Sequence, residues 1–341
     1  MRCISHLTFH VNRALRNAGA RICCSGPIHG FLIIAVLLSA VPASFADAPG
    51  PAVVRFHFVR GFAVIVPVTV NGRGPYDFML DTGSTITTVD RELGKELALT
   101  PQEQGTVTTL TQRAPGLLAF ARSVAVGAVT ERNVEVMIRD LSGLRSIAPT
   151  TRGVLGQNAL NHADFLLDYR HKLMEFDTDG ALARSLGGHH VPLRRETVDG
   201  DPLYANLAVH ATVSDQGARA GNFLLDSGAA SLVLFDRIEQ EGIGFAEGWV
   251  TDAAGGRLFA DVREMQVVID GKSREVATHV LAFKGAGKEI DGLLPTSIFD
   301  RIYISNDGGF AIFEPKVKKP GPMDRMIADL TSQATAHRPK S

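Results

Sequence analysis

Two aspartates in matched surroundings could act together as one acid–base pair. Asp81 lies in residues 78–84, FMLDTGS, and Asp226 lies in residues 223–229, FLLDSGA. Two carboxyl groups at close range cannot both ionise cheaply, so they share one proton. The ionised carboxylate can then take a proton from water while the protonated carboxyl hydrogen-bonds a substrate carbonyl. Such a pair is suited to hydrolysing an amide bond without a covalent intermediate.

Each Asp-Thr/Ser-Gly tripeptide read alone is also ordinary turn chemistry, because an Asp side chain at a strand end can cap its own loop. The matched pair favours catalysis over this simpler interpretation, since a motif gains weight from its predicted context. Gly83 and Gly228 let the backbone turn sharply and approach closely after each aspartate. The apolar residues before each aspartate raise the cost of charge and hold the geometry.

The elements that must position these aspartates are short strands rich in β-branched residues. The hairpin predicted before Asp81 has strands at 62–70 and 76–80 and a turn at 71–75. The hairpin predicted before Asp226 has strands at 203–213 and 221–225 and a turn at 215–217. Short helices are expected after the cap residues Asp90 and Asp236 and at 157–162. Few segments show long helical periodicity, so the predicted class is all-β with short helices.

The chain repeats itself once, at nearly constant spacing. The two aspartates lie 145 residues apart (226 − 81), and the two predicted helix caps lie 146 apart (236 − 90). The segments 153–156, GVLG, and 292–295, GLLP, begin 139 residues apart (292 − 153). Landmarks that keep their order indicate a duplicated β-rich domain. We therefore predict an N-terminal lobe at 53–185 and a C-terminal lobe at 190–315, each supplying one aspartate.

Two further segments predict hairpins at matching places in the two copies. The first, at 105–116, is polar and β-prone, so we expect it to be exposed. The second has its tip at 251–258. The residues singled out in these hairpins are Gly105, Thr106, Val107, Gly255 and Gly256.

These patterns resemble the signature of the retropepsin and pepsin superfamily. In each half a hydrophobic strand leads to Asp-Thr/Ser-Gly, a flap-like hairpin follows, and a hydrophobic-hydrophobic-Gly stretch precedes a short helix. The resemblance covers about residues 54–315 and looks most like bacterial exported retropepsin-like aspartic peptidases with both lobes in one chain. It implies two pseudo-twofold-related β-barrel lobes, with Asp81 and Asp226 as the catalytic pair between them.

The resemblance also implies roles for the residues beside the pair. Thr82 and Ser227 would exchange hydroxyl hydrogen bonds behind the carboxyl groups, and the backbone of Gly83 and Gly228 would support them. The hairpin residues singled out above would belong to two flaps.

The sequence departs from this pattern in three places. Ser84 supplies a hydroxyl three residues after Asp81, whereas Ala229 stands at the matching position. A hydrogen bond to the charged form favours that form, so we expect Ser84 to leave Asp81 with more of the negative charge. The first flap candidate has no Tyr, which puts pepsin-like substrate preference in doubt, and Pro295 replaces the second Gly of the late motif.

The amino terminus predicts a signal peptide at 1–46. Arginines precede an apolar run at 31–41, which is too short to span a bilayer comfortably. Small residues around Ala46 offer a cleavage site, so we expect export to the periplasm or the extracellular space, with no stable membrane span after cleavage. The alternative is an uncleaved anchor. All three cysteines lie within the first 24 residues, so the mature chain would have none.

Composition argues against several other classes. The formal net charge is −1, which gives no reason to expect a nucleic-acid partner. His189 and His190 have no spaced partners, and neither a dinucleotide loop nor a phosphate loop is present, so we expect neither a metal nor a cofactor. The polar tail at 316–341 is expected to be disordered.

We therefore predict an exported, monomeric aspartic endopeptidase that hydrolyses polypeptides with a water activated between two aspartates. The alternative is a catalytically silent retropepsin-like module that binds peptides or envelope components in the same cleft. Intact Asp81 and Asp226 favour the enzyme, while Ala229 and the unusual first flap leave the alternative open.

Overall fold

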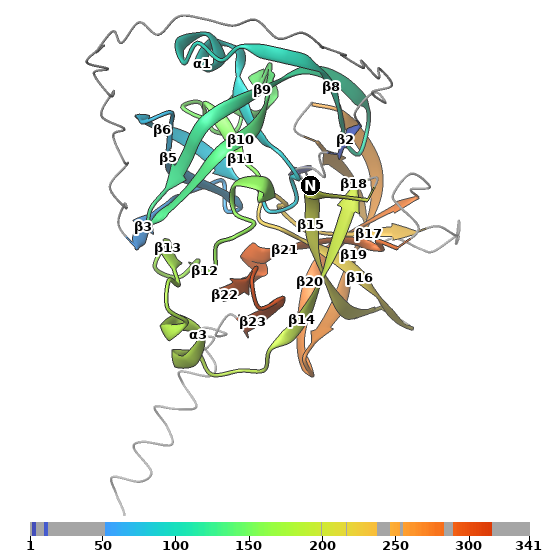
Figure 1. The fold of residues 1–341 in the computed structure, drawn as a ribbon. Helices are drawn as coiled ribbons and strands as arrows, with labels where there is room; N and C mark the ends of the chain where they lie inside the picture. Colours follow the sequence, from blue (N-terminus) through green and yellow to red (C-terminus); the bar gives the residue numbers. More distant parts are fainter. Residues whose placement is uncertain are drawn as a thin grey trace, which may run out of the picture.

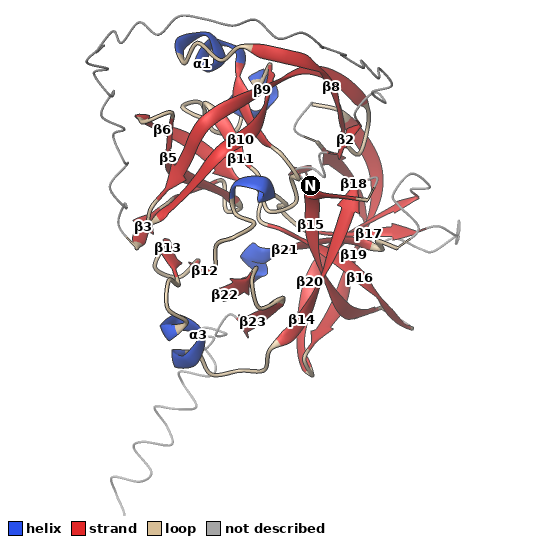
Figure 2. Ribbon diagram, in the orientation of Figure 1, coloured by secondary structure: helices blue, strands red, loops and turns tan. Residues whose placement is uncertain are grey.

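The computed structural model describes residues 2–4, 10–12, 52–198, 200–215, 217–236, 246–252, 255–282 and 289–315. Within these ranges the chain is mostly β-strand with a few short helices, as Figures 1 and 2 show. The all-β class predicted from the sequence is confirmed. No helix in the described part of the chain is both long enough and apolar enough to cross a membrane.

The hairpin that leads to Asp81 turns over only two residues. β5 (Ala63–Val70) and β6 (Arg73–Leu80) are joined by Asn71 and Gly72, whose φ angles are 55° and 73°. Asn and Gly tolerate this left-handed region, which matches the twist of the paired strands. The turn is therefore shorter than predicted, and the second strand begins earlier than expected.

Strand pairing on both sides fixes the place where β6 ends. β6 pairs antiparallel with β5 on one edge and in parallel with β11 (Gly153–Leu155) on the other. Beyond it, β11 pairs antiparallel with β7 (Thr87–Asp90), and β7 pairs in parallel with β10 (Val129–Arg139). The backbone N–H of Asp81 donates to Leu155 O at 3.0 Å. Asp81 is thus held at the end of a strand that has neighbours on both edges.

The same set of pairings occurs again around Asp226. β16 (Ala218–Asp226) pairs in parallel with β21 (Gly292–Pro295), β21 antiparallel with β17 (Leu232–Asp236), and β17 in parallel with β20 (Lys272–Ala282). The order and direction match the β6, β11, β7 and β10 set. Two sequence segments with one pattern therefore build two equivalent strand ends, each carrying an aspartate.

The register of these pairings corrects one predicted landmark. Val89 and Leu234 lie opposite the glycines that open β11 and β21. The next residue is Asp90 in the first half but Phe235 in the second, so Asp236 lies one position too late to match Asp90. The helix expected after Asp236 lies outside the described residues.

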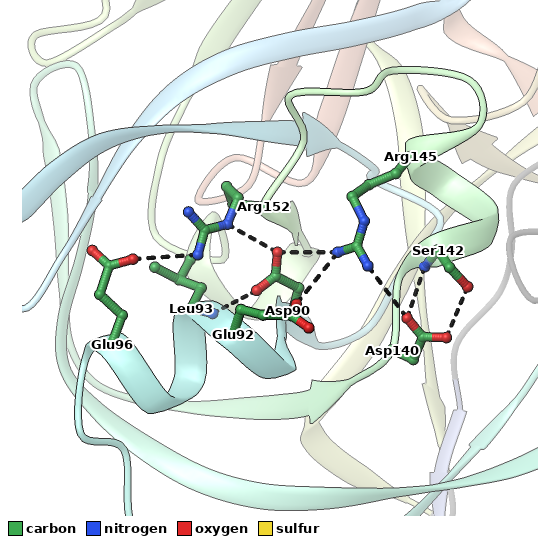
Figure 3. A network of polar contacts seen from close by, with 8 residues as sticks. All are labelled: Asp90, Glu92, Leu93, Glu96, Asp140, Ser142, Arg145 and Arg152. Carbon is green, nitrogen blue, oxygen red and sulfur yellow. Dashed lines mark hydrogen bonds and ion pairs between the residues drawn. The ribbon is translucent and has the colours of Figure 1, made fainter.

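Asp90 is a buried carboxylate that joins α1 (Arg91–Glu96) to the segment before β11 (Figure 3). Its Oδ1 accepts a hydrogen bond from Leu93 N at 2.5 Å, which confirms the predicted cap. Its Oδ2 accepts from Arg152 Nε at 2.9 Å and from Arg145 Nη1 at 3.2 Å. A buried charge is tolerated when it is paired and hydrogen-bonded in this way. The network ties α1 and β7 to the chain that delivers β11 beside β6.

The strands lie in two sheets. One runs in the order β2-β8-β9-β10-β7-β11-β6-β5-β4, and the other in the order β1-β18-β19-β20-β17-β21-β16-β15-β14-β23-β22-β12-β13-β3. Because β12 pairs with β22, strands from the predicted first lobe complete the sheet that contains the second. The remaining strands are β1 (Arg2–Ile4), β2 (His10–Asn12), β3 (Val53–Arg55), β4 (His57–Val59), β8 (Pro101–Thr108), β9 (Arg113–Val126), β12 (Phe165–Asp168), β13 (Leu173–Phe176), β14 (Val191–Val198), β15 (Asp201–Ser214), β18 (Ala246–Thr251), β19 (Arg257–Ile269), β22 (Phe299–Ser305) and β23 (Phe310–Pro315).

The other helices are single turns or little more. They are α2 (Ser142–Arg145), α3 (Ala181–Ser185) and the 3-10 turns η1 (Gln157–Ala159) and η2 (Thr296–Ile298). η1 is shorter than the helix predicted at 157–162. β1 and β2 pair with the outer edges of β18 and β8 and fall within the predicted signal peptide. The apolar run and cleavage site of that signal, and the tail at 316–341, lie outside the described residues.

One apolar cluster runs through both halves of the chain. Phe78 and Phe223, each three residues before an aspartate, are fully buried in it together with Phe165 from the hairpin between them. Burial of these large side chains is the main source of stabilisation at this place. The strand ends that carry the aspartates are therefore anchored in the core.

Candidate active site

Asp81 and Asp226 come together at the two equivalent strand ends. Their side chains are 1% and 0% exposed, and the charge of Asp81 acts directly on the Asp226 carboxyl group. The loop after Asp81 packs directly on the second carboxyl group, since a Cβ built on Gly83 would lie 2.7 Å from Asp226 Cγ. Residues 145 positions apart in the sequence thus form one buried dyad.

A glycine amide holds each carboxyl group in the same way. Gly83 N donates to Asp81 Oδ1 at 3.0 Å, and Gly228 N donates to Asp226 Oδ1 at 2.8 Å. A backbone N–H is a fixed donor that favours the ionised form of a carboxyl group. Both glycines therefore lie where the resemblance implies.

Thr82 and Ser227 bind each strand end to the backbone of the other half. Thr82 Oγ1 accepts from Ser227 N at 3.0 Å and donates to Leu225 O at 2.8 Å. Ser227 Oγ accepts from Thr82 N at 3.0 Å and donates to Leu80 O at 3.0 Å. The hydroxyl groups thus bond the opposite main chain rather than each other. We call these four hydrogen bonds the crossed clamp.

Burial and mutual repulsion raise the pKa values of both carboxyl groups. Desolvation is the main cause that raises the pKa of Asp81, and the neighbouring Asp226 carboxyl group and the backbone N–H groups of Gly83 and Ser84 oppose it. Desolvation raises the pKa of Asp226 as well, and the negative charge of Asp81 raises it further. Two coupled carboxyl groups titrate as a pair, so their raised pKa values indicate that the dyad keeps one shared proton to a higher pH than an ordinary carboxyl group does.

Ser84 does not act as the sequence predicts. Its hydroxyl donates to Ile86 O at 3.0 Å, and a hydroxyl has only one proton to donate. It therefore cannot also donate to Asp81. The predicted role of the Ser84 hydroxyl is therefore wrong. That Asp81 carries more of the negative charge than Asp226 stays a prediction.

The first flap candidate is less exposed than the sequence predicts. Gly105, Thr106 and Val107 lie in β8, which forms a hairpin with β9 around the turn at 109–112. Val107 is fully buried and packs with Tyr204 in a small apolar cluster. The alternating pattern of β8 indicated a strand but did not reveal that its apolar face would meet the other half of the chain.

The tips of the two flap candidates contact each other through Asp252. Its Oδ2 accepts from Thr109 Oγ1 at 2.5 Å, from Thr111 N at 3.2 Å and from the Thr111 hydroxyl. Its Oδ1 accepts from Gly256 N at 2.9 Å, which places the predicted Gly255-Gly256 turn beside it. Four donors satisfy a carboxylate that is only 2% exposed. We call this contact the tip lock.

Leu110 adds an apolar contact to the tip lock. It lies at the tip of the hairpin formed by β8 and β9, which we call the first hairpin. It is 8% exposed, because it packs in a cluster of second-half residues that includes Val250, Ala260 and Leu281. Burying a Leu side chain contributes about 1.5–3 kcal/mol. The first hairpin is therefore docked on the second half by both polar and apolar contacts.

Sequence reasoning missed three polar groups near the dyad. Asn206 in β15 is buried, and its Nδ2 donates to Thr82 O at 3.3 Å. Tyr169 OH lies 2.5 Å from Thr296 Oγ1, and burial together with the charge of Asp226 raises the pKa of Tyr169. Asn206 and Tyr169 have no local motif, whereas Thr296 directly follows the GLLP segment and could have been suspected.

The comparisons with known proteins agree with the first half of this site. Residues 66–159, which include Asp81, match the family model for aspartyl proteases. The resemblance to retropepsin-like aspartyl proteases is thereby confirmed. No curated protein matches the chain. Among the described residues, no group of three or more His, Cys, Asp or Glu side chains could hold a metal ion.

Proposed function

We propose that this protein is an aspartic endopeptidase in which Asp81 and Asp226 activate one water molecule. The observation that carries the proposal is the buried pair of neighbouring carboxyl groups, held by the crossed clamp. The match of residues 66–159 to aspartyl proteases supports protease chemistry and a polypeptide substrate. The finer assignment to two pepsin-like β-barrel lobes in one monomer rests on the repeated strand pairings around the aspartates.

The proposed reaction uses the unequal charges of the pair. Asp81, as the carboxylate, takes a proton from water while the resulting hydroxide forms a bond to the peptide carbonyl carbon. Asp226, as the carboxylic acid, hydrogen-bonds the carbonyl oxygen and stabilises its developing charge. A proton then passes from the dyad to the peptide nitrogen, the C–N bond breaks, and the pair again holds one proton.

The observed conformation is closed to substrate. Both carboxyl groups are at most 1% exposed, so neither water nor a peptide reaches them until part of the molecule moves. The hairpin of β8 and β9 is the element we propose to move. Its described contacts with the second half are side-chain contacts near its tip, namely the tip lock, Leu110 and the packing of Val107 on Tyr204. Flap opening of this kind commonly gates access to an active site.

The alternative is a catalytically silent module that binds peptides or envelope components in the same cleft, and it also requires the hairpin to open. A dyad that never opens would serve only to hold the two halves together.

We further propose that the protein is exported after removal of residues 1–46, and amino-terminal sequencing of the mature protein tests this. A mature chain that retains residues 31–41 would instead be anchored.

A proteome-derived peptide library incubated with the mature protein tests the proposed function. Asp81→Asn and Asp226→Asn should each abolish hydrolysis, and the double variant should be no worse, because the pair acts as one unit. The parent should show a bell-shaped pH profile whose limbs belong to the pair. Its alkaline limb should lie well above the usual carboxyl pKa, because burial and the charge of Asp81 raise the pKa of Asp226. Full activity in either single variant would exclude the dyad.

A further inference from the structure

We propose that Asn206 is a positioning residue that makes Asp81, and not Asp226, the ionised member of the pair. The proposal rests on the proposed function of the dyad. Asn206 belongs to the second half, 124 residues from Thr82, and its buried Nδ2 donates to Thr82 O at 3.3 Å. This contact joins the second half to the loop that follows Asp81.

The contact reaches Asp81 through a single peptide group. The carbonyl of Thr82 and the N–H of Gly83 belong to the same peptide unit, and that N–H donates to Asp81 Oδ1 at 3.0 Å. Hydrogen bonds in series polarise one another, so a donor on the carbonyl strengthens the N–H as a donor. A stronger hydrogen bond to the carboxylate favours its ionised form. Asn206 therefore supports the charge on Asp81 without touching it.

The second half of the chain lacks this support. Met79 and Leu224 each lie two residues before an aspartate, and the residues opposite them are Ile65 in β5 and Ala208 in β15. Two residues before these stand Ala63 and Asn206, which therefore occupy equivalent positions. The methyl group of an alanine can donate no hydrogen bond. Among the described residues, the peptide group beside Asp81 has a side-chain donor on its carbonyl, and the matching position beside Asp226 offers none.

The amide of Asn206 is retained at a cost. Its Oδ1 is buried and, among the described residues, has no hydrogen-bond partner. A buried polar atom without a partner is unfavourable, so packing alone would be served better by an apolar side chain. The reverse orientation would place Oδ1 against Thr82 O, two acceptors together, so Nδ2 is the atom that faces the carbonyl. The amide is explained by the bond that it donates.

Few other charges can set the difference between the two aspartates. Asp81 and Asp226 act on each other, and the charge of Asp226 raises the pKa of the nearby Tyr169. Burial raises the pKa of Tyr169, so its phenol stays neutral and adds no charge. Fixed dipoles such as the peptide group of Thr82 and Gly83 are therefore what can distinguish the two carboxyl groups.

The test compares Asn206→Leu with Asn306→Leu. Asn306 is also buried, and its side chain donates to Ala163 O and accepts from Gln157 Nε2, both at 2.6 Å, without bonding either aspartate or the peptide groups that hold them. The readouts are the titration of the Asp81 and Asp226 carboxyl carbons by NMR and the pH profile of hydrolysis. Asn206→Leu should raise the lower apparent pKa of the pair, and with it the acidic limb, by roughly 0.2–0.5 pH units. Asn306→Leu should lower stability but leave both the lower apparent pKa of the pair and the acidic limb of the pH profile unchanged.

The two readouts separate this proposal from the proposed function. Titration without a shift in Asn206→Leu, or an equal shift in Asn306→Leu, overturns the role of Asn206. A parent that titrates normally but cleaves no peptide removes the proposed function and still tests Asn206, because NMR needs no substrate. Asn206→Ala, which is smaller and also lacks the donor, should show the same shift and serves where the Leu variant does not fold.

Discussion

Gly83 lies so close to Asp226 that a Cβ atom on it would be 2.7 Å from the carboxyl carbon and 2.9 Å from Oδ2. Real Cβ atoms do not approach other heavy atoms this closely. The backbone of Gly83 does not have a positive φ angle, so other residues could adopt its conformation. Glycine is required here because there is no room for a side chain. The two halves can bring their carboxyl groups together only because residue 83 has no side chain.

Gly83→Ala should therefore push the two carboxyl groups apart. A displacement of about 1 Å in a catalytic group can reduce the rate about 100-fold, so we expect at least that loss in kcat/KM. The matched control is Gly187→Ala, since a Cβ on Gly187 meets no atom within 4 Å. The measurement is peptide hydrolysis by both variants, with folding checked by circular dichroism. Normal activity in Gly83→Ala would show that the reacting groups lie elsewhere.

The crossed clamp should contribute stability as well as geometry. Thr82→Val keeps the shape of the side chain but leaves the buried N–H of Ser227 without its acceptor, which costs about 1–3 kcal/mol. The matched control is Thr88→Val, because Thr88 is fully buried and its hydroxyl has no partner among the described residues. Urea unfolding of the two variants is the measurement. Equal losses of unfolding free energy would mean that the clamp hydrogen bonds add nothing.

Burial of the dyad should make the stability of the fold depend on pH. The pKa values of both aspartates are raised by desolvation, so above the ordinary pKa of about 4 the folded state holds more protons than the unfolded state. Stability should then fall as pH rises from about 4 through the folded pKa values. Asp226→Asn removes one raised group and should flatten this fall. The measurement is the unfolding free energy of the parent and of this variant between pH 4 and 8. If the free energy falls equally steeply with pH in both proteins, Asp226 does not contribute to the pH dependence of stability.

Local sequence patterns could predict the dyad because each of its parts is local. An apolar run, an aspartate and a small hydroxyl residue before glycine define a strand end, and the repeat implies that two such ends meet. The hydroxyl of Ser84 was misjudged because its partner, Ile86 O, depends on the turn that follows Asp81. A side chain with several acceptors in reach is not assigned by spacing alone.

Contacts between distant segments could not be predicted in the same way. Asn206 interrupts a strand pattern and has no motif, and its partner lies 124 residues earlier. The pattern of the first hairpin favoured an exposed strand, yet Val107 and Leu110 are buried against the second half. Burial of this kind is decided by tertiary packing, which overrides local polarity.

The tip lock should decide whether substrate reaches the dyad. Thr109 Oγ1 lies 2.5 Å from Asp252 Oδ2, so the two side chains already meet. We expect cysteines at these positions to approach closely enough on small backbone movements to form a disulfide, which would hold the hairpin closed. All native cysteines lie within the first 24 residues, so the chain from residue 47 onward offers no competing thiol. Thr109→Cys/Asp252→Cys should lose hydrolysis when oxidised and regain it on reduction.

The single variants Thr109→Cys and Asp252→Cys control for loss of the native hydrogen bonds. Each should hydrolyse peptides equally well with and without reductant, because neither can form the cross-link. Mass spectrometry establishes that the disulfide is present in the double variant, and assays on a short and a long peptide compare access. If the cross-linked protein cleaves both peptides at the parent's rate, the first hairpin does not gate the dyad. The opening that the buried carboxyl groups require must then come from a movement of another element.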